Sequence, residues 1–331
     1  MKKTHLSTLF SVATLLSCMS AKVHATTPMD APLKEGGLTE IECEYNLEEK
    51  QLFTRLNLTA DKGVYHYTVY VPNGYAAHPE KHYPCLFIFS PSGNAQLGTV
   101  KDYVAKNEWV AVMLKESKNG PVGPASGNFL AAHDDVVKRL RIKEGSKVVT
   151  GLSGGARGAS HMVGARAGFA GIILQGAGFN FYENGKYNTT ALKEHRSLRV
   201  YVLFGETDSN IKETKWLEDR LPNYTKLKIE TFKGGHVWAP ADAMDIALEW
   251  VMETVNEAEA EERAKRTDVP LKTTRPTRPW TATMGAVFEA SLLRTERGFV
   301  YLKAADGMER KVPVSALIQA DRDYITSMIH E

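Results

Sequence analysis

The sequence predicts an α/β protein with a doubly wound, mostly parallel sheet, followed by a small all-β domain. Short apolar runs alternate with segments suited to helices, and one of these runs ends in Gly-x-Ser-x-Gly. Such alternation is typical of a parallel sheet that helices cover on both faces. The all-β domain follows from a change of composition between residues 256 and 279, beyond which turn residues separate three strand-like runs.

The elements are expected in a regular order after a polar lead-in at residues 26–40. Strands are predicted at 64–71, 85–89, 109–114, 148–150, 171–174, 198–204 and 227–232. Helices are predicted at 100–106, after residue 153, and at 128–141, 212–221 and 239–265. We therefore expect a sheet domain at 26–255, a helical tail with a proline-rich linker at 256–275, and a small β domain at 276–331. Its strands are predicted at 286–293, 298–303 and 308–314.

Residues 1–25 are expected to be an export signal. A basic start at Lys2 and Lys3 precedes an apolar core, residues 6–16, which is too short to span a bilayer. Cleavage after Ala25 is the favoured expectation, and the competing interpretation is a lipoprotein box in which Cys18 carries a lipid. Either alternative predicts a secreted or periplasmic protein with no transmembrane span after signal removal.

Composition argues against a chain that is disordered throughout and against a nucleic-acid-binding protein. The 331 residues are 43% hydrophobic and 24% charged, which is ordinary for a globular chain. Removing residues 1–25 takes away three lysines and no acid, so the formal charge changes from +2 to −1 (+2 − 3) and gives no support for a nucleic-acid partner. Of the two remaining cysteines, Cys85 lies in an apolar run, so a buried free thiol is favoured over a bridge to Cys43. Neither is near a histidine in metal-ligand spacing, and no metal site is expected.

Ser153 is the candidate nucleophile. The β-branched run at Val148 and Val149 ends at Gly151-Leu152-Ser153-Gly154-Gly155, and small residues suited to a tightly packed helix follow. This pattern is the sequence form of a nucleophile elbow, a tight turn that exposes the serine above the sheet edge. Glycine two residues either side avoids a Cβ clash in that turn. A plain Gly/Ser turn without chemistry is the less favoured alternative.

A base and an acid are needed to activate such a serine. On a doubly wound sheet they follow in the order serine, acid, histidine. His236 is the candidate base, because it comes after the strand at 227–232 with two glycines before it. Asp208 is the candidate acid, just past the strand at 198–204, with Glu206 as its competitor. The other downstream histidines are less suitably placed: His161, His195 and His330.

The remaining site residues are expected on loops. Two N–H donors must stabilise the oxyanion, and the candidates are Gly154 and, from the loop after the strand at 85–89, Ser92. Phe179, Phe181 and Trp238 are candidate pocket residues, with loop anchoring as the equal alternative.

Together these residues resemble the α/β-hydrolase superfamily over about residues 40–255. They are most similar to secreted esterases related to polyhydroxybutyrate depolymerases and to feruloyl or acetylxylan esterases. The matching segments are Val69-Tyr70-Val71-Pro72-x-Gly74-Tyr75, Tyr83-Pro84, the elbow, and Gly234-Gly235-His236-x-Trp238. One departure is that Ser90-Pro91 stands where such enzymes usually carry His-Gly.

The C-terminal segment, about residues 276–326, resembles the small SH3-like homology domain of fungal endocytic adaptors. The matching residues are Arg278-x-Trp280, Gly285, Glu289-Ala290, Val300-x-Leu302, Gly307, Val312-Pro313 and Asp321-x-x-Tyr324. In that family the domain binds short peptide motifs. Trp280 and Tyr324 are equally well read as core residues or as ligand contacts.

The resemblance implies a secreted serine esterase that needs no cofactor and acts on small-molecule, polysaccharide-linked or polyester esters. A peptidase of this fold usually carries a large gating domain, for which the chain has no room. The alternative from a different class is a non-catalytic binding protein, with a degenerate hydrolase scaffold and a C-terminal module that tethers a protein or envelope partner. Ser90-Pro91 favours that alternative, and the intact Ser153, Asp208 and His236 set opposes it.

Overall fold

The computed structural model describes residues 26–179, 182–183, 186–187, 192, 197–221, 225–267, 277–283, 285–296 and 299–329. The main sheet has eight strands in the order β1-β2-β4-β3-β5-β6-β9-β10. Their bounds are β1 Leu38–Tyr45, β2 Gly63–Tyr70, β3 Tyr83–Phe89, β4 Val110–Leu114, β5 Ile142–Leu152, β6 Phe169–Gln175, β9 Arg199–Gly205 and β10 Lys226–Phe232. Strand β2 runs antiparallel to both of its neighbours, β1 and β4. The other strands of the sheet, in the spatial order β4, β3, β5, β6, β9 and β10, run parallel to one another.

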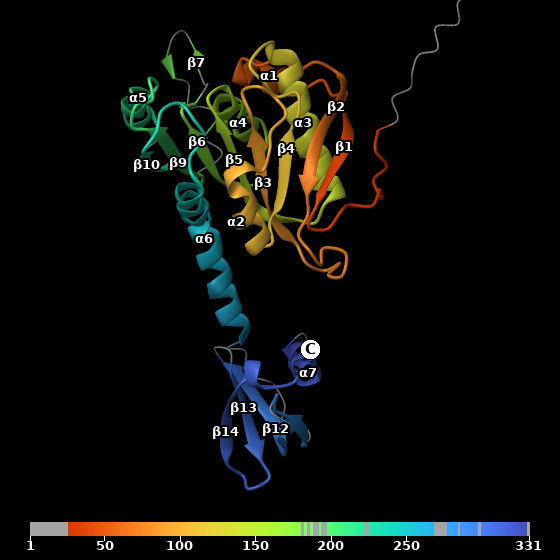
Figure 1. The fold of residues 1–331 in the computed structure, drawn as a ribbon. Coiled ribbons are helices and arrows are strands. Elements are labelled where there is room, and N and C mark those ends of the chain that lie inside the picture. Colours follow the sequence, from red (N-terminus) through yellow and green to blue (C-terminus); the bar gives the residue numbers. More distant parts are fainter. Residues whose placement is uncertain are drawn as a thin grey trace, which may run out of the picture.

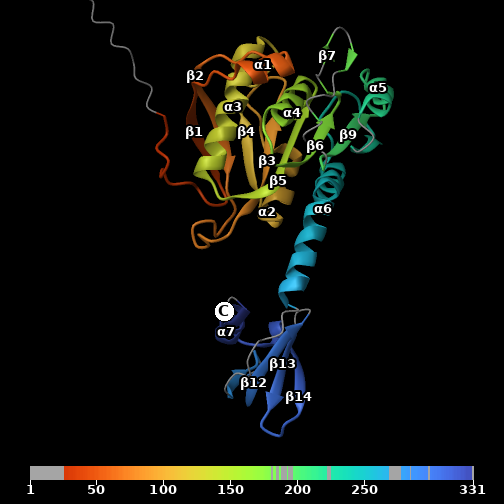
Figure 2. The same cartoon turned by 180° about the vertical axis from the view of Figure 1, so that it is seen from behind.

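Helices cover both faces of this sheet, as the alternation of elements predicts (Figure 1). One face packs against α1 (Lys50–Leu56), α3 (Val122–Arg139), α4 (Gly154–Ala165) and α5 (Glu213–Arg220). The other face packs against α2 (Lys101–Lys106), the 3-10 turn η1 (Gly98–Val100) before it, and α6 (Ala241–Thr267). Strands β4, β6 and β9 are buried at every position, which explains their unbroken apolar sequence. The same layers are seen from behind in Figure 2.

The edge strand β1 was not predicted: its first three residues belong to the predicted polar lead-in at 26–40, and residues 41–45 were assigned to no element. Its side chains alternate: Ile41, Cys43 and Tyr45 are buried, while the acidic residues between them face outward. Alternation with charges on the outer face is the pattern of a half-buried edge strand. Cys43 on β1 and Cys85 on β3 are both free and buried, as expected.

Helix α3 begins at Val122, six residues before its predicted start at residue 128. The prolines at 121 and 124 both lie where a helix tolerates proline. Pro121 occupies the N-cap position and Pro124 lies in the first turn, where backbone N–H groups have no intrahelical acceptor. The other predicted elements of the sheet region have the right type, with ends shifted by a few residues, most at the start of β5.

The C-terminal residues form a separate antiparallel sheet in the order β11-β12-β13-β14. Its strands are β11 Arg278–Thr281, β12 Val287–Glu296, β13 Phe299–Ala304 and β14 Glu309–Pro313, followed by the 3-10 turn η3 Val314–Ala316 and helix α7 Gln319–Ile329. Strand β11 and helix α7 were not predicted. Trp280 is fully buried and donates its indole N–H to the carbonyl of Ala290 at 3.0 Å, so it is a core residue.

Membrane-spanning helices and the described ranges both concern the predicted export signal. In the part of the chain that the structure describes, no helix is both long enough and apolar enough to cross a bilayer. The predicted export signal at 1–25, with Cys18, lies outside the described residues, as does the part of the predicted tail and linker (256–275) beyond residue 267. Phe181, His195 and His330 lie outside them too.

Candidate active site

Ser153 occupies a strained turn between β5 and α4. Its backbone angles are φ 54° and ψ −121°, a conformation that non-glycine residues rarely adopt. The turn brings Gly151 against the next helical turn, where a Cβ atom would lie 2.4 Å from the carbonyl carbon of Gly155. The strain and the close approach are those of a nucleophile elbow.

His236 and Asp208 form a hydrogen-bonded pair. The Nδ1 atom of His236 lies 2.9 Å from Oδ2 of Asp208. The Asp208 side chain is 1% exposed and that of His236 is 38% exposed, so the carboxylate is enclosed while the ring reaches the surface. The second oxygen, Oδ1, accepts the backbone N–H of Asn210 at 2.8 Å. Glu206, the competing acid, is exposed.

The end of β6 brings this pair to the elbow. The backbone N–H of Ser153 donates to the carbonyl of Gln175 at 2.8 Å. At the next residue, Gly176, a Cβ atom would lie 3.0 Å from Oδ2 of Asp208 and 3.1 Å from Nδ1 of His236. The Asp208–His236 pair therefore lies beside the end of β6, the same strand end that binds the backbone of Ser153.

The Ser153 hydroxyl has no hydrogen-bond partner among the described residues, His236 included. Catalytic hydrogen bonds in free enzymes are often long and tighten only when substrate binds. Because Nδ1 of His236 faces Asp208, its Nε2 atom is the ring nitrogen left for a hydroxyl proton. The pair thus sets the ring tautomer that proton transfer requires.

Two residues that hold the site were not predicted. The Gln175 side chain accepts the backbone N–H of Ala239 at 2.9 Å, which fixes the segment just after His236. The Asn210 side chain donates to the carbonyl of Gly176 at 2.9 Å, which fixes the loop that carries Asp208. A polar residue at the end of an otherwise apolar strand was the only sequence signal for Gln175.

The predicted oxyanion residues have different surroundings. Gly154 is the first residue of α4, directly after Ser153. Ser92 lies in the loop after β3, but its backbone N–H points to the hydroxyl of Ser90 in the same loop, with 3.4 Å between the nitrogen and the oxygen. This loop packs on the loop after β4, since Asn119 donates its backbone N–H to the carbonyl of Pro91 at 2.9 Å.

Of the predicted pocket residues, Phe179 is placed as a core anchor. It is 1% exposed and belongs to the hydrophobic cluster beneath α3 and α4. This position matches the loop-anchoring alternative rather than a pocket role. Trp238 is 37% exposed, two residues beyond His236. Within the described ranges, no group of three or more histidine, cysteine or acidic residues could hold a metal ion.

Comparisons with known proteins found similar structures only. One is a ferulic acid esterase (TM-score 0.47, 15% identity, 65% of this chain and 98% of that one). Another is a puromycin hydrolase (TM-score 0.43, 11% identity, 60% of this chain and 38% of that one). A third is an S-formylglutathione hydrolase from Agrobacterium tumefaciens (TM-score 0.44, 12% identity, 70% of this chain and 98% of that one). No family model matches the chain. No curated protein matches it either.

The fold class follows from the topology described above. A mostly parallel eight-stranded sheet has one reversed strand near its edge, helices on both faces, and a strained serine on the turn after β5. These features define an α/β-hydrolase fold.

Proposed function

We propose that this chain is a serine hydrolase that cleaves carboxylic esters through an acyl-enzyme on Ser153. The observation that carries the proposal is the Asp208–His236 hydrogen bond at the strand end that also binds the Ser153 backbone. In the first step His236 Nε2 accepts the hydroxyl proton as Ser153 Oγ attacks the ester carbonyl. The same proton then passes to the leaving alcohol, and a water molecule resolves the acyl-enzyme by the reverse route.

Each residue has a distinct part in this scheme. Asp208 stays ionised, orients the ring and stabilises the imidazolium that forms. Gly154, at the N-terminus of α4, offers its backbone N–H to the oxyanion, and Ser92 is the second proposed donor. Ser92 must give up a contact of 3.4 Å to serve, and a hydrogen bond that long is weak.

That same contact favours a second candidate, a non-catalytic binding protein on a hydrolase scaffold. If the Ser92 N–H stays bound to Ser90, only one oxyanion donor remains, and losing a donor typically costs about 3–4 kcal/mol of transition-state stabilisation. The intact Asp208–His236 pair weighs against this candidate, because a scaffold without chemistry has no need of it.

Esterase assays separate the two candidates. Phenyl acetate and longer phenyl esters would be offered to the full chain and to the Ser153→Ala variant. The ester hydrolase proposal requires turnover by the wild type that the variant loses. Turnover that persists in Ser153→Ala, or none in the wild type at any acyl length, supports the binding protein instead.

We further propose that the chain is exported and that the C-terminal sheet is an SH3-like module that contacts a protein or envelope partner. Export rests on the sequence of residues 1–25. A mature N-terminus at Thr26 supports cleavage after Ala25, whereas a lipid-modified Cys18 at the N-terminus supports the lipoprotein alternative. Because Trp280 is buried, a partner of this module must be met by other residues.

A further inference from the structure

A small cavity of about 170 Å³ lies beside the elbow. Gly154, the residue directly after Ser153, forms part of its wall, together with Arg157 and His161 further along α4. The opposite wall comes from the loop after β4 and from the first turns of α3, with Phe129 among the apolar residues. The wall of the cavity therefore includes the residue that follows Ser153 in the chain.

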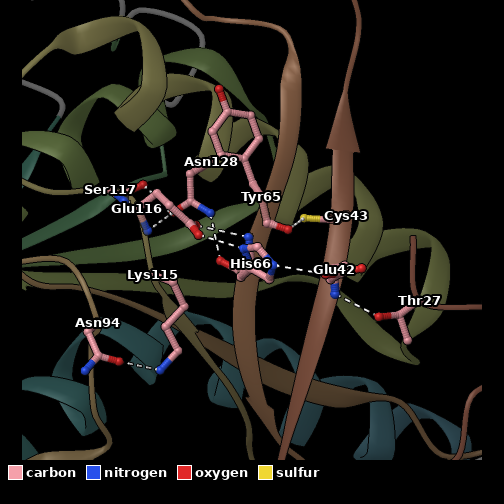
Figure 3. A network of polar contacts seen from close by, with 10 residues as sticks. All are labelled: Thr27, Glu42, Cys43, Tyr65, His66, Asn94, Lys115, Glu116, Ser117 and Asn128. Carbon is pink, nitrogen blue, oxygen red and sulfur yellow. Dashed lines mark hydrogen bonds and ion pairs between the residues drawn. The ribbon is translucent and has the colours of Figure 1, made fainter. Parts of the chain in front are cut away.

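The loop that closes the cavity is fixed at its base. The Asn128 side chain accepts the backbone N–H groups of Glu116 and Ser117 at 3.1 and 2.9 Å (Figure 3). Lys115 reaches Asn94 on the loop after β3 at 2.7 Å. The next residues, Lys118 and Asn119, are therefore presented to the cavity on a preorganised turn rather than on a free loop.

Three polar groups in the cavity wall have no partner among the described residues. Ser126 is 1% exposed, yet no described residue hydrogen-bonds its hydroxyl. The side chains of Lys118 and Asn119 also have none, and the Asn119 amide rests on Gly154, where a Cβ atom would meet its oxygen at 1.5 Å. Lys118 and Asn119 are exposed and the Ser126 hydroxyl lines the cavity, so all three can bind a polar group that enters it.

The charge of the cavity is positive. None of the described residues in its wall is acidic, whereas Lys118 and Arg157 both lie there. The Arg157 guanidinium is paired with Glu213 at 2.7 Å, so its charge is largely compensated. Lys118 has no ion pair with any described residue and supplies the uncompensated positive charge.

The volume limits the occupant. A cavity of about 150 Å³ holds one benzene molecule, which has six non-hydrogen atoms, so about 170 Å³ suits an occupant of roughly that size. A chain of two methylenes that ends in a carboxylate has five, and its oxygens match the ammonium, amide and hydroxyl donors of the wall. A fatty acyl chain carries no acceptor at its end and leaves those donors unpaired.

We propose that this cavity is the acyl subsite and that it selects short acyl groups ending in a carboxylate, of which succinyl is the type. The proposal rests on the proposed esterase function. Lys118 pairs with the terminal carboxylate, and Asn119 and Ser126 donate hydrogen bonds to it. Charge-assisted hydrogen bonds of this kind are stronger than neutral ones, and they become stronger still where water is excluded.

The test compares two esters of equal shape. Monobenzyl succinate and benzyl 4-methylpentanoate differ only in a terminal carboxylate against an isosteric branched methyl pair. We expect kcat/KM to be about 10- to 100-fold higher for the succinate ester, because this factor corresponds to the strength of one hydrogen bond to a charged group. Lys118→Met should remove most of this preference. Lys138→Met, an exposed lysine on α3 outside the cavity, should leave both rates unchanged.

The outcomes separate this inference from the esterase proposal. Equal rates for the two esters overturn the subsite, as does a preference that survives Lys118→Met. The subsite is also overturned if the wild type cleaves phenyl acetate but leaves monobenzyl succinate intact. Loss of all ester cleavage, phenyl acetate included, contradicts the esterase proposal itself.

Discussion

The backbone carbonyl of Gln175 accepts the N–H of Ser153 at 2.8 Å, while the side chain of the same glutamine accepts the N–H of Ala239 at 2.9 Å. One residue at the end of β6 thus joins the elbow to the segment that follows His236. The glutamine is itself held, since its Nε2 donates to the Thr150 hydroxyl at 3.0 Å. The position of the Ser153 backbone relative to the segment after His236 is therefore fixed by a buried polar network.

We expect Gln175→Ala to weaken both stability and activity. The variant leaves the Ala239 N–H buried without an acceptor, and an unsatisfied buried group costs about 1–3 kcal/mol. Urea unfolding measures the loss of stability, and kcat on phenyl acetate measures the displacement of His236. A variant with wild-type kcat would show that Gln175 does not position the base.

Asp208→Asn should lower kcat by about 10⁴-fold, because an amide no longer holds the ring in the required tautomer. The matched control is Glu206→Gln, an exposed acid two residues away on the same loop, which should keep wild-type activity. Circular dichroism would confirm that both variants fold. If Glu206→Gln were the inactive variant, the acid would be wrongly assigned.

Gly151→Ala should destabilise the fold, because its Cβ would lie 2.4 Å from the Gly155 backbone. Overpacking of this kind typically costs about 1–3 kcal/mol or more. Gly63→Ala is the control, since a Cβ there meets its nearest neighbour, the Tyr65 ring, at an ordinary 3.8 Å. Chemical denaturation measures both variants, and equal stability would contradict the tight elbow.

His133 should make the protein less stable in mild acid. Burial, aided by the neighbouring Lys147 ammonium, lowers the pKa of His133 below its ordinary value of 6.5, although Asp134 opposes the shift. The ring is therefore neutral in the fold, and the stability it provides is present above pH 6.5 and decreases as the pH falls toward the lower pKa. His133→Gln should flatten this part of the profile of unfolding free energy against pH.

His66 is the control for that measurement, because its pKa is shifted in the opposite direction. Burial favours the neutral ring, but hydrogen bonds to Glu116 and Glu42 outweigh it and raise the pKa of His66 (Figure 3). Its contribution is present below pH 6.5 and decreases as the pH rises toward the higher pKa. His66→Gln should therefore lose stability at low pH and little at high pH. Identical profiles for the two variants would contradict both assignments.

The sequence predicts the strands of the sheet and the pairing of Asp208 with His236, because both follow from local patterns. Apolar runs and the glycines around Ser153 report on their own neighbourhoods, and a strand end predicts where Asp208 and His236 lie. The partners of Gln175 and of Asn119 depend on contacts between segments far apart in the chain, so no local pattern reports them. Strand β1 was missed although its alternation is visible, because its acidic outer face made the segment look like a polar lead-in.

Covalent labelling tests the central claim most directly. The full chain would be treated with diisopropyl fluorophosphate, and the modified residue located by mass spectrometry. We expect one adduct per chain, on Ser153, which is absent in Ser153→Ala and forms far more slowly in His236→Gln. A chain that takes up no reagent, or takes it up at another residue, or reacts equally fast without His236, would contradict a nucleophile at 153 activated by that histidine.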